Sequence, residues 1–263
     1  MSDNNLTPRI EQLAPELEKI ISTSEPIQHL ADGFGGAQGP AEGPLWWEEG
    51  GYLLFSDIHN NRRMKYQPGS GVSLFLEPTN RANGLTRDLQ GRLVACEHDS
   101  RRVTRQEADG SITVVANSFQ GRRLNRPNDV VVRSDGCIYF TDPWSSPAAP
   151  EQWDLQYSGV YRMTPDLSTL SLLADDFVLP NGLAFSPDES VLYINDTRRG
   201  HITGETRREQ SLVQIRMAFL RVIQGNTCIF PSNTAFFFKF RTTRLPRDLL
   251  KEHLRERYVG RTS

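Results

Sequence analysis

The sequence predicts an all-β protein built like a β-propeller. Short apolar strands separated by Gly, Pro, Asn and Asp run through most of the 263 residues. A repeat becomes visible when these strands are aligned, because similar turns open successive units at spacings of 41, 45 and 53 residues. The opening turns are Glu42-Gly43-Pro44-Leu45, Asn83-Gly84-Leu85, Asn128-Asp129-Val130 and Asn181-Gly182-Leu183. A repeat of 40 to 50 residues is typical of a propeller blade, which must stack on its neighbours to cover its apolar faces.

Each unit continues in the same way after its opening turn. A polar turn leads into an apolar strand, and the four segments read EEGGYLLFSD, DLQGRLVACEH, SDGCIYFTD and PDESVLYIND. An acidic or imidazole group closes each of them, at Asp57, His98, Asp142 and Asp196. Because the closing group recurs in every unit, we expect a shared structural hydrogen-bonding role rather than four active-site roles.

The segments before and after the repeats differ from it. Apolar residues at three- and four-residue steps predict one amphipathic helix over residues 8–21, after Thr7 as a helix cap. We therefore divide the chain into an N-terminal extension (1–29), a partial propeller (30–202) and a divergent basic tail (203–263). The tail holds twelve Lys and Arg against five Asp and Glu, although the whole chain has a net charge of −2.

Composition excludes several other classes of protein. The three cysteines, Cys96, Cys137 and Cys228, are widely spaced and form no CxxC pair for zinc or redox chemistry. No GxSxG or HExxH motif occurs, which argues against a serine hydrolase of the α/β type and a zinc peptidase. Without a signal sequence or a long apolar run, the chain is expected to be soluble and cytoplasmic, with no nucleic-acid or membrane partner.

The repeats carry a resemblance to a known family. AEGPLWW, LLFSDIHNNRRMKY, NGLTRDLQGRLVACEH, RPNDVVVRSDGCIYFTDP, GVYRM and LPNGLAFSPDESVLYIND occur in order between about residues 30 and 201. They resemble the successive motifs of the senescence-marker-protein, gluconolactonase and luciferin-regenerating-enzyme family, and most of all bacterial gluconolactonases. The resemblance implies a six-bladed propeller, of which this chain has about four blades.

The resemblance also implies a metal site at the mouth of the propeller. By motif it assigns Glu42 of AEGP, Asn128 of RPND and Asn181 of PNGL as the ligands of one divalent metal. We expect Ca²⁺, because all three residues offer hard oxygen atoms. Arg126 and Asn128 are the implied contacts of a small lactone substrate. His98 is a further substrate-site candidate, with an ordinary structural turn role as the alternative.

The implied reaction is metal-assisted hydrolysis of a sugar lactone. In relatives the base is an Asp of a PDG-type motif after the PNGL unit, and no such motif follows Asn181 here, so the catalytic base has no counterpart. After Gly200 the only aspartate is Asp248, in LPRDLL. We therefore expect the C-terminal blades to be missing or replaced, and activity to be impaired. The abrupt change near residue 202 is typical of a shifted reading frame, and a polyanion-binding tail is the alternative.

Two other functions stay open from the sequence. One is a catalytically inactive propeller fragment or binding scaffold, which the missing PDG motif favours. The other is a lactonase that opens a different substrate, such as an aromatic or homoserine lactone. The sequence predicts no oligomeric state.

Overall fold

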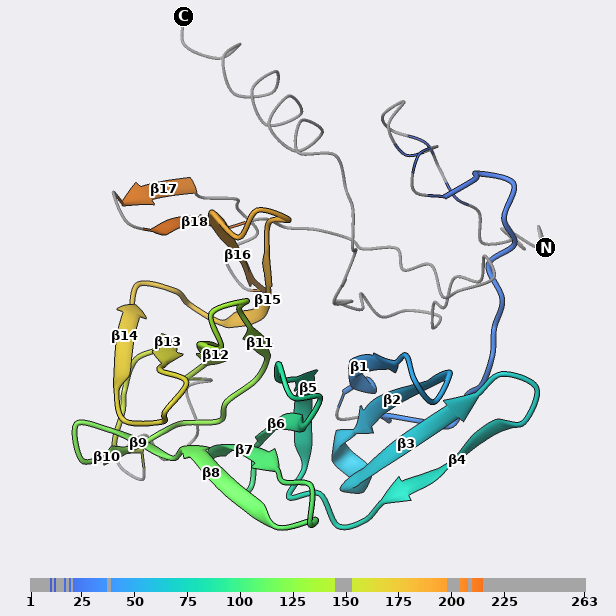
Figure 1. The fold of residues 1–263 in the computed structure, drawn as a ribbon, viewed down its shortest axis with the longest axis horizontal. Coiled ribbons are helices and arrows are strands. Elements are labelled where there is room, and N and C mark those ends of the chain that lie inside the picture. Colours follow the sequence, from blue (N-terminus) through green and yellow to red (C-terminus); the bar gives the residue numbers. More distant parts are fainter. Residues whose placement is uncertain are drawn as a thin grey trace, which may run out of the picture.

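The computed structural model describes residues 10, 12, 17, 19, 21–36, 39–144 and 153–197, and the backbone of 204–207 and 210–214. Nearly all of its regular structure is β-sheet, which confirms the predicted fold class. Figure 1 shows four sheets arranged as a fan, with β1, β5, β11 and β15 innermost and β4, β8 and β14 on the outside. The fan places the start of each innermost strand near one common centre.

Three of the sheets are four-stranded antiparallel meanders, as expected of propeller blades. The first contains β1 (Glu42–Trp47), β2 (Tyr52–Asp57), β3 (Arg62–Gln67) and β4 (Gly71–Leu76), with the short 3-10 helix η2 (Ile58–Asn60) between β2 and β3. The second contains β5 (Ala82–Arg87), β6 (Leu93–Glu97), β7 (Arg102–Gln106) and β8 (Ile112–Ala116). The third contains β11 (Val130–Val132), β12 (Ile138–Asp142), β13 (Gly159–Met163) and β14 (Leu170–Ala174). A two-stranded ribbon, β9 (Ser118–Phe119) and β10 (Arg122–Arg123), lies between the second and third sheets in the chain.

The fourth sheet departs from this pattern. Its first two strands, β15 (Pro180–Phe185) and β16 (Val191–Asp196), form the expected hairpin. The outer two, β17 (Gly204–Arg207) and β18 (Gln210–Gln214), are joined in the order β15-β16-β18-β17, and β18 pairs with β16 in parallel. The sheet therefore stops being a meander at the point where the repeat ends in the sequence.

Alternation along each strand builds the core between the sheets. Successive side chains point to opposite faces of a sheet. In β12, Phe140 therefore packs towards the second sheet with Val94 and Val103, whereas Tyr139 packs towards the fourth sheet with Ile194. A third cluster joins the first and second sheets, and its buried members are Leu54, Leu85, Leu93 and Ala95. Each pair of neighbouring sheets thus shares one apolar layer.

The strand-closing acids hold their own sheets together, as predicted. Asp57 accepts hydrogen bonds from the backbone N–H of Gly35 (2.8 Å) and from Arg62 (2.8 Å). Asp142 accepts one from the N–H of Asn125 (2.8 Å). Asp196 accepts two, from the N–H groups of residues 178 (2.8 Å) and 179 (3.0 Å). In each case the carboxylate fixes the segment that leads into the opening turn of its sheet.

In the second sheet, the predicted strand-closing residue was wrong by one position. There the closing group is Glu97 rather than His98, because Glu97 accepts hydrogen bonds from Asn80 (3.0 Å), Ser100 and Arg102 (2.8 Å). Arg102 stands five residues after Glu97, as Arg62 does after Asp57. The longer Glu side chain reaches the same position that Asp occupies elsewhere, and His98, one residue further on, contacts Asn83 instead.

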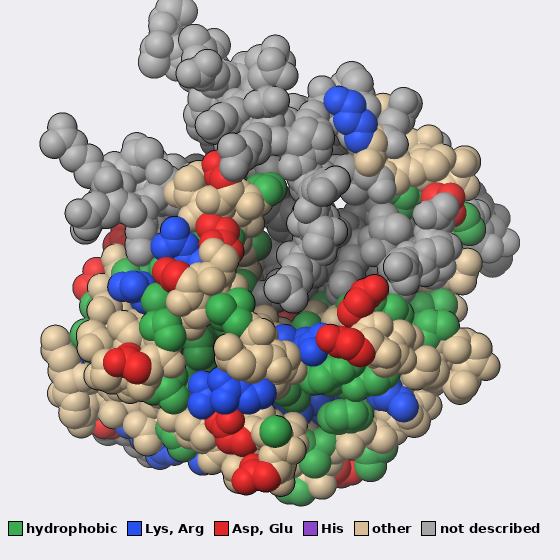
Figure 2. All heavy atoms as spheres, viewed as in Figure 1, with side chains coloured by type: hydrophobic (Ala, Val, Ile, Leu, Met, Phe, Trp, Pro, Cys, Tyr) green, Lys and Arg blue, Asp and Glu red, His purple; other side chains and the backbone are tan. Residues whose placement is uncertain are grey.

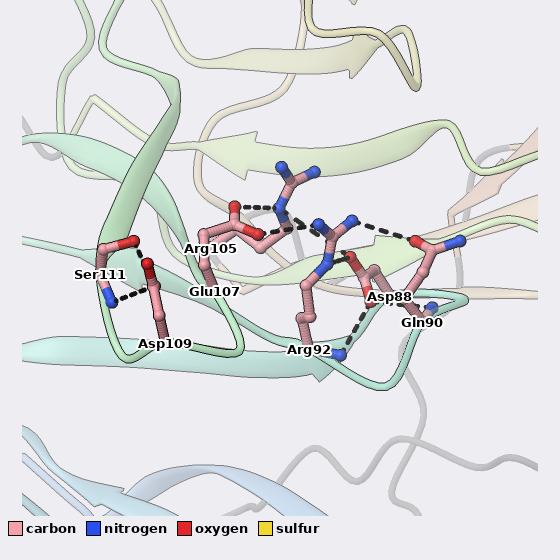
Figure 3. Close-up of polar contacts among 7 residues, drawn as sticks. All are labelled: Asp88, Gln90, Arg92, Arg105, Glu107, Asp109 and Ser111. Carbon is pink, nitrogen blue, oxygen red and sulfur yellow. Dashed lines mark hydrogen bonds and ion pairs between the residues drawn. The ribbon is translucent and has the colours of Figure 1, made fainter.

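Polar networks close the outer turns of the second sheet. Figure 3 shows Arg92 between Asp88 (2.7 Å) and Glu107 (2.8 Å), with Arg105 donating to Glu107 from the other side (2.8 Å). The Thr113 hydroxyl and these two arginines lower the pKa of Glu107.

On the face drawn in Figure 2, basic and acidic side chains are interspersed with apolar ones, so this face carries no broad region of positive or negative charge.

Most of the predicted N-terminal helix lies outside the described residues, as do the side chains of the predicted basic tail. Within the described part, Leu17 and Lys19 are in 3-10 conformation, and a small cluster joins Ile10, Leu17, Ile21 and Ile27. Cys96 and Cys137 are buried and form no disulfide, and Cys228 lies outside the described residues. Among the described residues no helix is long and apolar enough to cross a membrane.

We predict that Phe140→Ala lowers the free energy of unfolding by about 3 to 5 kcal/mol. The ring is fully buried and stacks on Tyr161 at a centroid distance of 5.2 Å, so its loss leaves a cavity between two sheets. Leu74→Ala is the control, because Leu74 is 54% exposed on the outer strand and its loss should change stability by less than about 0.5 kcal/mol. Urea denaturation measures both, and equal effects would contradict the assignment of the core.

Candidate functional site

The opening turns of neighbouring sheets touch one another around the centre of the fan. Gly43 has a φ of +57°, and a Cβ added there would lie 2.0 Å from the carbonyl oxygen of Asn83. The N–H of Gly84 donates to the carbonyl of Asn128 (2.8 Å), and a Cβ on Gly84 would lie 2.6 Å from the Cα of Asp129. Glycine is therefore required where one turn approaches the next this closely. The result is a continuous row of turns that form the mouth.

Two hydroxyl groups extend this row from sheet to sheet. The Ser56 hydroxyl donates to the carbonyl of Asn83 (2.6 Å), and the Thr141 hydroxyl donates to the carbonyl of Asn181 (2.8 Å). Each hydroxyl stands directly before a strand-closing aspartate and reaches the opening residue of the next sheet. Glu42, Asn83, Asn128 and Asn181 thus follow one another around the mouth, as their positions in the repeat predict.

Two carboxylates at this mouth, those of Glu42 and Asp129, lie near enough to interact electrostatically. Burial and, to a smaller extent, the charge of Asp129 raise the pKa of Glu42 to about 7. Asp129 is oriented by the N–H of Val130 (2.9 Å) and by the N–H of Leu183 in the next sheet (3.3 Å). Burial and a neighbouring negative charge thus disfavour ionisation of Glu42, and a cation bound beside it would favour the charged carboxylate again.

The amide residues at the mouth fit a hard cation. The side-chain oxygen of Asn128 is buried and has no hydrogen-bond partner within the described part of the chain. An orphaned buried oxygen of this kind carries a free-energy cost unless a donor or a cation satisfies it. Asn181 is half-buried and presents a second amide. No three His, Cys, Asp or Glu side chains of the described residues come together, so the only candidate set here combines carboxylate and amide oxygens.

The histidine candidate, His98, lies near several basic side chains. His98 is half-buried, and its Nε2 is 3.4 Å from the amide nitrogen of Asn83. Burial, followed by the charges of Arg126, His59 and Arg81, lowers the pKa of His98 to about 4. At neutral pH the imidazole is therefore uncharged and can accept or donate a hydrogen bond at the mouth.

Arg126 is exposed and close to the mouth, two residues before Asn128. Its guanidinium carbon lies 5.4 Å from the centre of the Trp153 ring. The same ring is approached by Arg101, at 4.6 Å. The structure thus brings Arg126 near His98, and Asp129 near Glu42.

The sequence analysis missed Asp129 and Trp153. A signal for Asp129 was present, because the residue after the opening Asn or Glu is glycine in the other three turns and aspartate only in the third. An acid in a position that otherwise demands glycine indicates a local function. Trp153 had no such signal, because it stands outside the repeated motifs.

We predict that His98 makes the protein less stable in mild acid. Its pKa is lower in the folded chain than the value of 6.5 expected when unfolded, so the folded state binds fewer protons between about pH 4 and pH 6.5. Between pH 7 and pH 5 the wild type should lose about 1 to 2 kcal/mol more stability than His98→Gln, after allowance for contact with water.

Urea denaturation of both proteins at the two pH values measures this difference. The buried acid of Asp142, whose pKa burial raises to about 7, has the opposite pH dependence but is present in both proteins and cancels. Identical losses in wild type and variant, or an imidazole NMR titration of His98 near pH 6.5, would contradict the assignment.

Comparison with known proteins finds similarity over most of the chain. A family model described as "SMP-30/Gluconolactonase/LRE-like region" matches residues 40–227, beyond the end of the motif resemblance near residue 201. A gluconolactonase of Zymomonas mobilis is 33% identical over 213 residues, covering 73% of this chain and 57% of that protein. A lactonase drp35 of Staphylococcus aureus is 36% identical over 70 residues, which are 27% of this chain and 20% of that one.

A solved structure is also similar. The gluconolactonase from Xanthomonas campestris is 36% identical and superposes with a TM-score of 0.66, covering 78% of this chain and 69% of that chain. The chain thus spans 69% of the Xanthomonas structure and 57% of the length of the Zymomonas protein.

Proposed function

Because the chain belongs to the SMP-30/gluconolactonase/LRE-like family, we propose that it acts as a metal-dependent hydrolase that opens a sugar lactone. The observation that supports this most directly is the mouth itself. There a carboxylate of raised pKa, Glu42, lies in one row of turns with the buried and unpartnered amide oxygen of Asn128. Such a set of oxygen atoms suits calcium.

Glu42, Asn128 and Asn181 would hold the ion, and Asp129 would add negative charge beside them. A bound divalent cation supplies Lewis-acid polarisation of a carbonyl and stabilises the negative oxygen that develops in ester hydrolysis. The raised pKa of Glu42 means that its proton competes with the cation. Calcium affinity should therefore increase as the pH rises through 7.

The other residues of the mouth would bind and orient the substrate. His98, uncharged at neutral pH, and Asn83 provide hydrogen-bonding groups that suit the hydroxyl groups of a sugar lactone. Arg126 provides a cation close to the amide of Asn128. We infer that these side chains fix the lactone ring with its carbonyl towards Glu42. That the substrate is a sugar lactone, and not an aromatic or homoserine lactone, is part of the same proposal.

A second candidate is a protein that binds calcium and lactones without turnover. One sequence observation favours it, because no PDG-type motif follows Asn181 and no aspartate other than Asp248 follows Gly200. In that case the mouth would keep its metal ligands but would lack the base that accepts the proton of water. A cytoplasmic location is part of the proposal for either candidate.

We predict that Glu42→Gln weakens calcium binding at least tenfold, because it replaces the only carboxylate among the three proposed ligands. Isothermal titration calorimetry with Ca²⁺ at pH 7.5 measures the affinity. Glu48→Gln is the matched control, since Glu48 lies on the turn after the same strand and is exposed. Equal calcium affinity in both variants would contradict the ligand assignment.

The wild type, Glu42→Gln and Glu48→Gln also test whether the protein hydrolyses a lactone. A pH-stat assay of glucono-δ-lactone, corrected for the uncatalysed rate, should show hydrolysis that EGTA abolishes and Ca²⁺ restores. Wild type and Glu48→Gln should be active, whereas Glu42→Gln should not. Calcium binding without any hydrolysis would support the non-catalytic candidate, and neither binding nor hydrolysis in a folded sample would contradict both.

A further inference from the structure

Three arginines at the rim of the mouth form no ion pair among the described residues. Ten ion pairs join the described residues, and neither Arg101, Arg123 nor Arg126 takes part in any of them. This differs from the arginines of the strands nearby, such as Arg92, Arg102 and Arg105, which all pair with carboxylates. Arg101 follows His98 in the turn before β7, Arg123 ends β10, and Arg126 lies in the loop between β10 and Asn128.

Backbone carbonyls and one indole hold these arginines in place. Arg101 donates through Nε to the carbonyls of Leu124 (2.6 Å) and Asn125 (3.0 Å), and Arg123 donates to the carbonyl of Ser100 (3.0 Å). The guanidinium carbons of Arg101 and Arg126 both lie over the ring of Trp153, at 4.6 Å and 5.4 Å. Cation–π contacts of this length fix a guanidinium without neutralising it.

The arginines repel one another in this arrangement. Burial lowers the pKa of Arg101, and the charges of Arg123 and Arg126 lower it further, whereas the carboxylates of Asp154 and Asp142 partly oppose this. Asp154 is the nearby exposed carboxylate, and it already accepts the backbone N–H of Arg123 (2.9 Å). Like charges held together at a partly exposed place are stabilised when an anion binds between them.

The position of this group connects it to the mouth. Arg126 stands two residues before Asn128, and its charge acts on His98. Arg101 lies on the loop that begins after His98. A ligand that reaches His98 and Asn83 therefore has the arginine group beside it, on the side of the second and third sheets.

We propose that Arg101, Arg123 and Arg126 form an anion-binding subsite for a second acid group, a phosphate or a carboxylate, carried by the lactone away from its reacting carbonyl. The inference rests on the proposed function and narrows the substrate class to acidic sugar lactones. Guanidinium groups suit both anions, because each presents paired donors to two oxygen atoms. Trp153 is a positioning residue in this subsite, since it orients two of the three arginines.

Binding of the open-chain acids tests the subsite without turnover. We would titrate the calcium-loaded protein with gluconate, glucarate and 6-phosphogluconate, which share one carboxylate and differ only in the second acid group. Isothermal titration calorimetry should show that 6-phosphogluconate, glucarate or both bind at least tenfold more tightly than gluconate, as expected for charge-assisted hydrogen bonds. Which of the two binds more tightly identifies the acid group.

Variants connect the preference to the arginines. Arg126→Met should reduce it to threefold or less, and Trp153→Leu should reduce it while keeping all three charges. Arg133→Met is the matched control, because Arg133 lies beyond the far end of β11, where it is ion-paired with Asp135 (3.4 Å). That variant should keep the preference. In the unmodified protein, the preference should also decrease from 50 to 500 mM NaCl.

Three results would overturn the subsite. They are equal affinity for the three acids in the unmodified protein, a preference that survives in Arg126→Met, or a preference that is lost equally in Arg133→Met. None of them bears on hydrolysis of glucono-δ-lactone. Conversely, a folded protein that prefers the doubly acidic ligands but hydrolyses no lactone would retain the subsite and contradict the proposed activity.

Discussion

The contact between the opening turns of neighbouring sheets is the constraint on which the site depends. Gly43 and Gly84 allow one turn to lie directly against the next, and Ser56 and Thr141 bind the following turn through its carbonyl. These contacts satisfy the backbone groups of the turns and leave the side chains of Glu42 and Asn128 to face the mouth. A site made from residues 86 positions apart in the chain is thereby fixed by hydrogen bonds of the backbone.

The electrostatics of the mouth follow from this placement. The acidic groups Glu42 and Asp129 lie near each other, whereas the basic groups Arg126, His59 and Arg81 act on His98. A centre that attracts a cation and a rim that attracts an anion can bind the two ends of one polar ligand. Because the acidic and basic groups are separate, Arg126 does not pair with Glu42. Such an ion pair would neutralise the charges that bind the cation and the anion.

Repetition made much of the architecture predictable. The innermost strands, the opening turns and the structural role of Asp57, Asp142 and Asp196 were expected from the sequence, because each recurs with a fixed spacing and a physical reason. Features that occur once were harder to predict. In the second sheet Glu97 replaces the shorter aspartate one residue before the expected position of His98, and the parallel pairing of β18 with β16 has no counterpart in the other sheets. Asp129 and the Trp153 contacts depend on the approach of separate loops, which no local pattern encodes.

The alternation of Tyr139 and Phe140 has a consequence for how the protein unfolds. A sheet whose two faces belong to two different apolar layers cannot lose one neighbour without exposing half of its own core. Stability then behaves as a sum of nearest-neighbour couplings along the fan, much as in repeat proteins. Within the described sheets, amide hydrogens of β6 and β12 are those whose exchange requires two interfaces to open together, so they should report global unfolding, whereas the outermost strands exchange by local opening. Of the mouth residues, Asn83 and Asn128 belong to sheets that are covered on both faces, whereas Glu42 and Asn181 belong to the first and fourth sheets, each of which shares an apolar layer with one described neighbour.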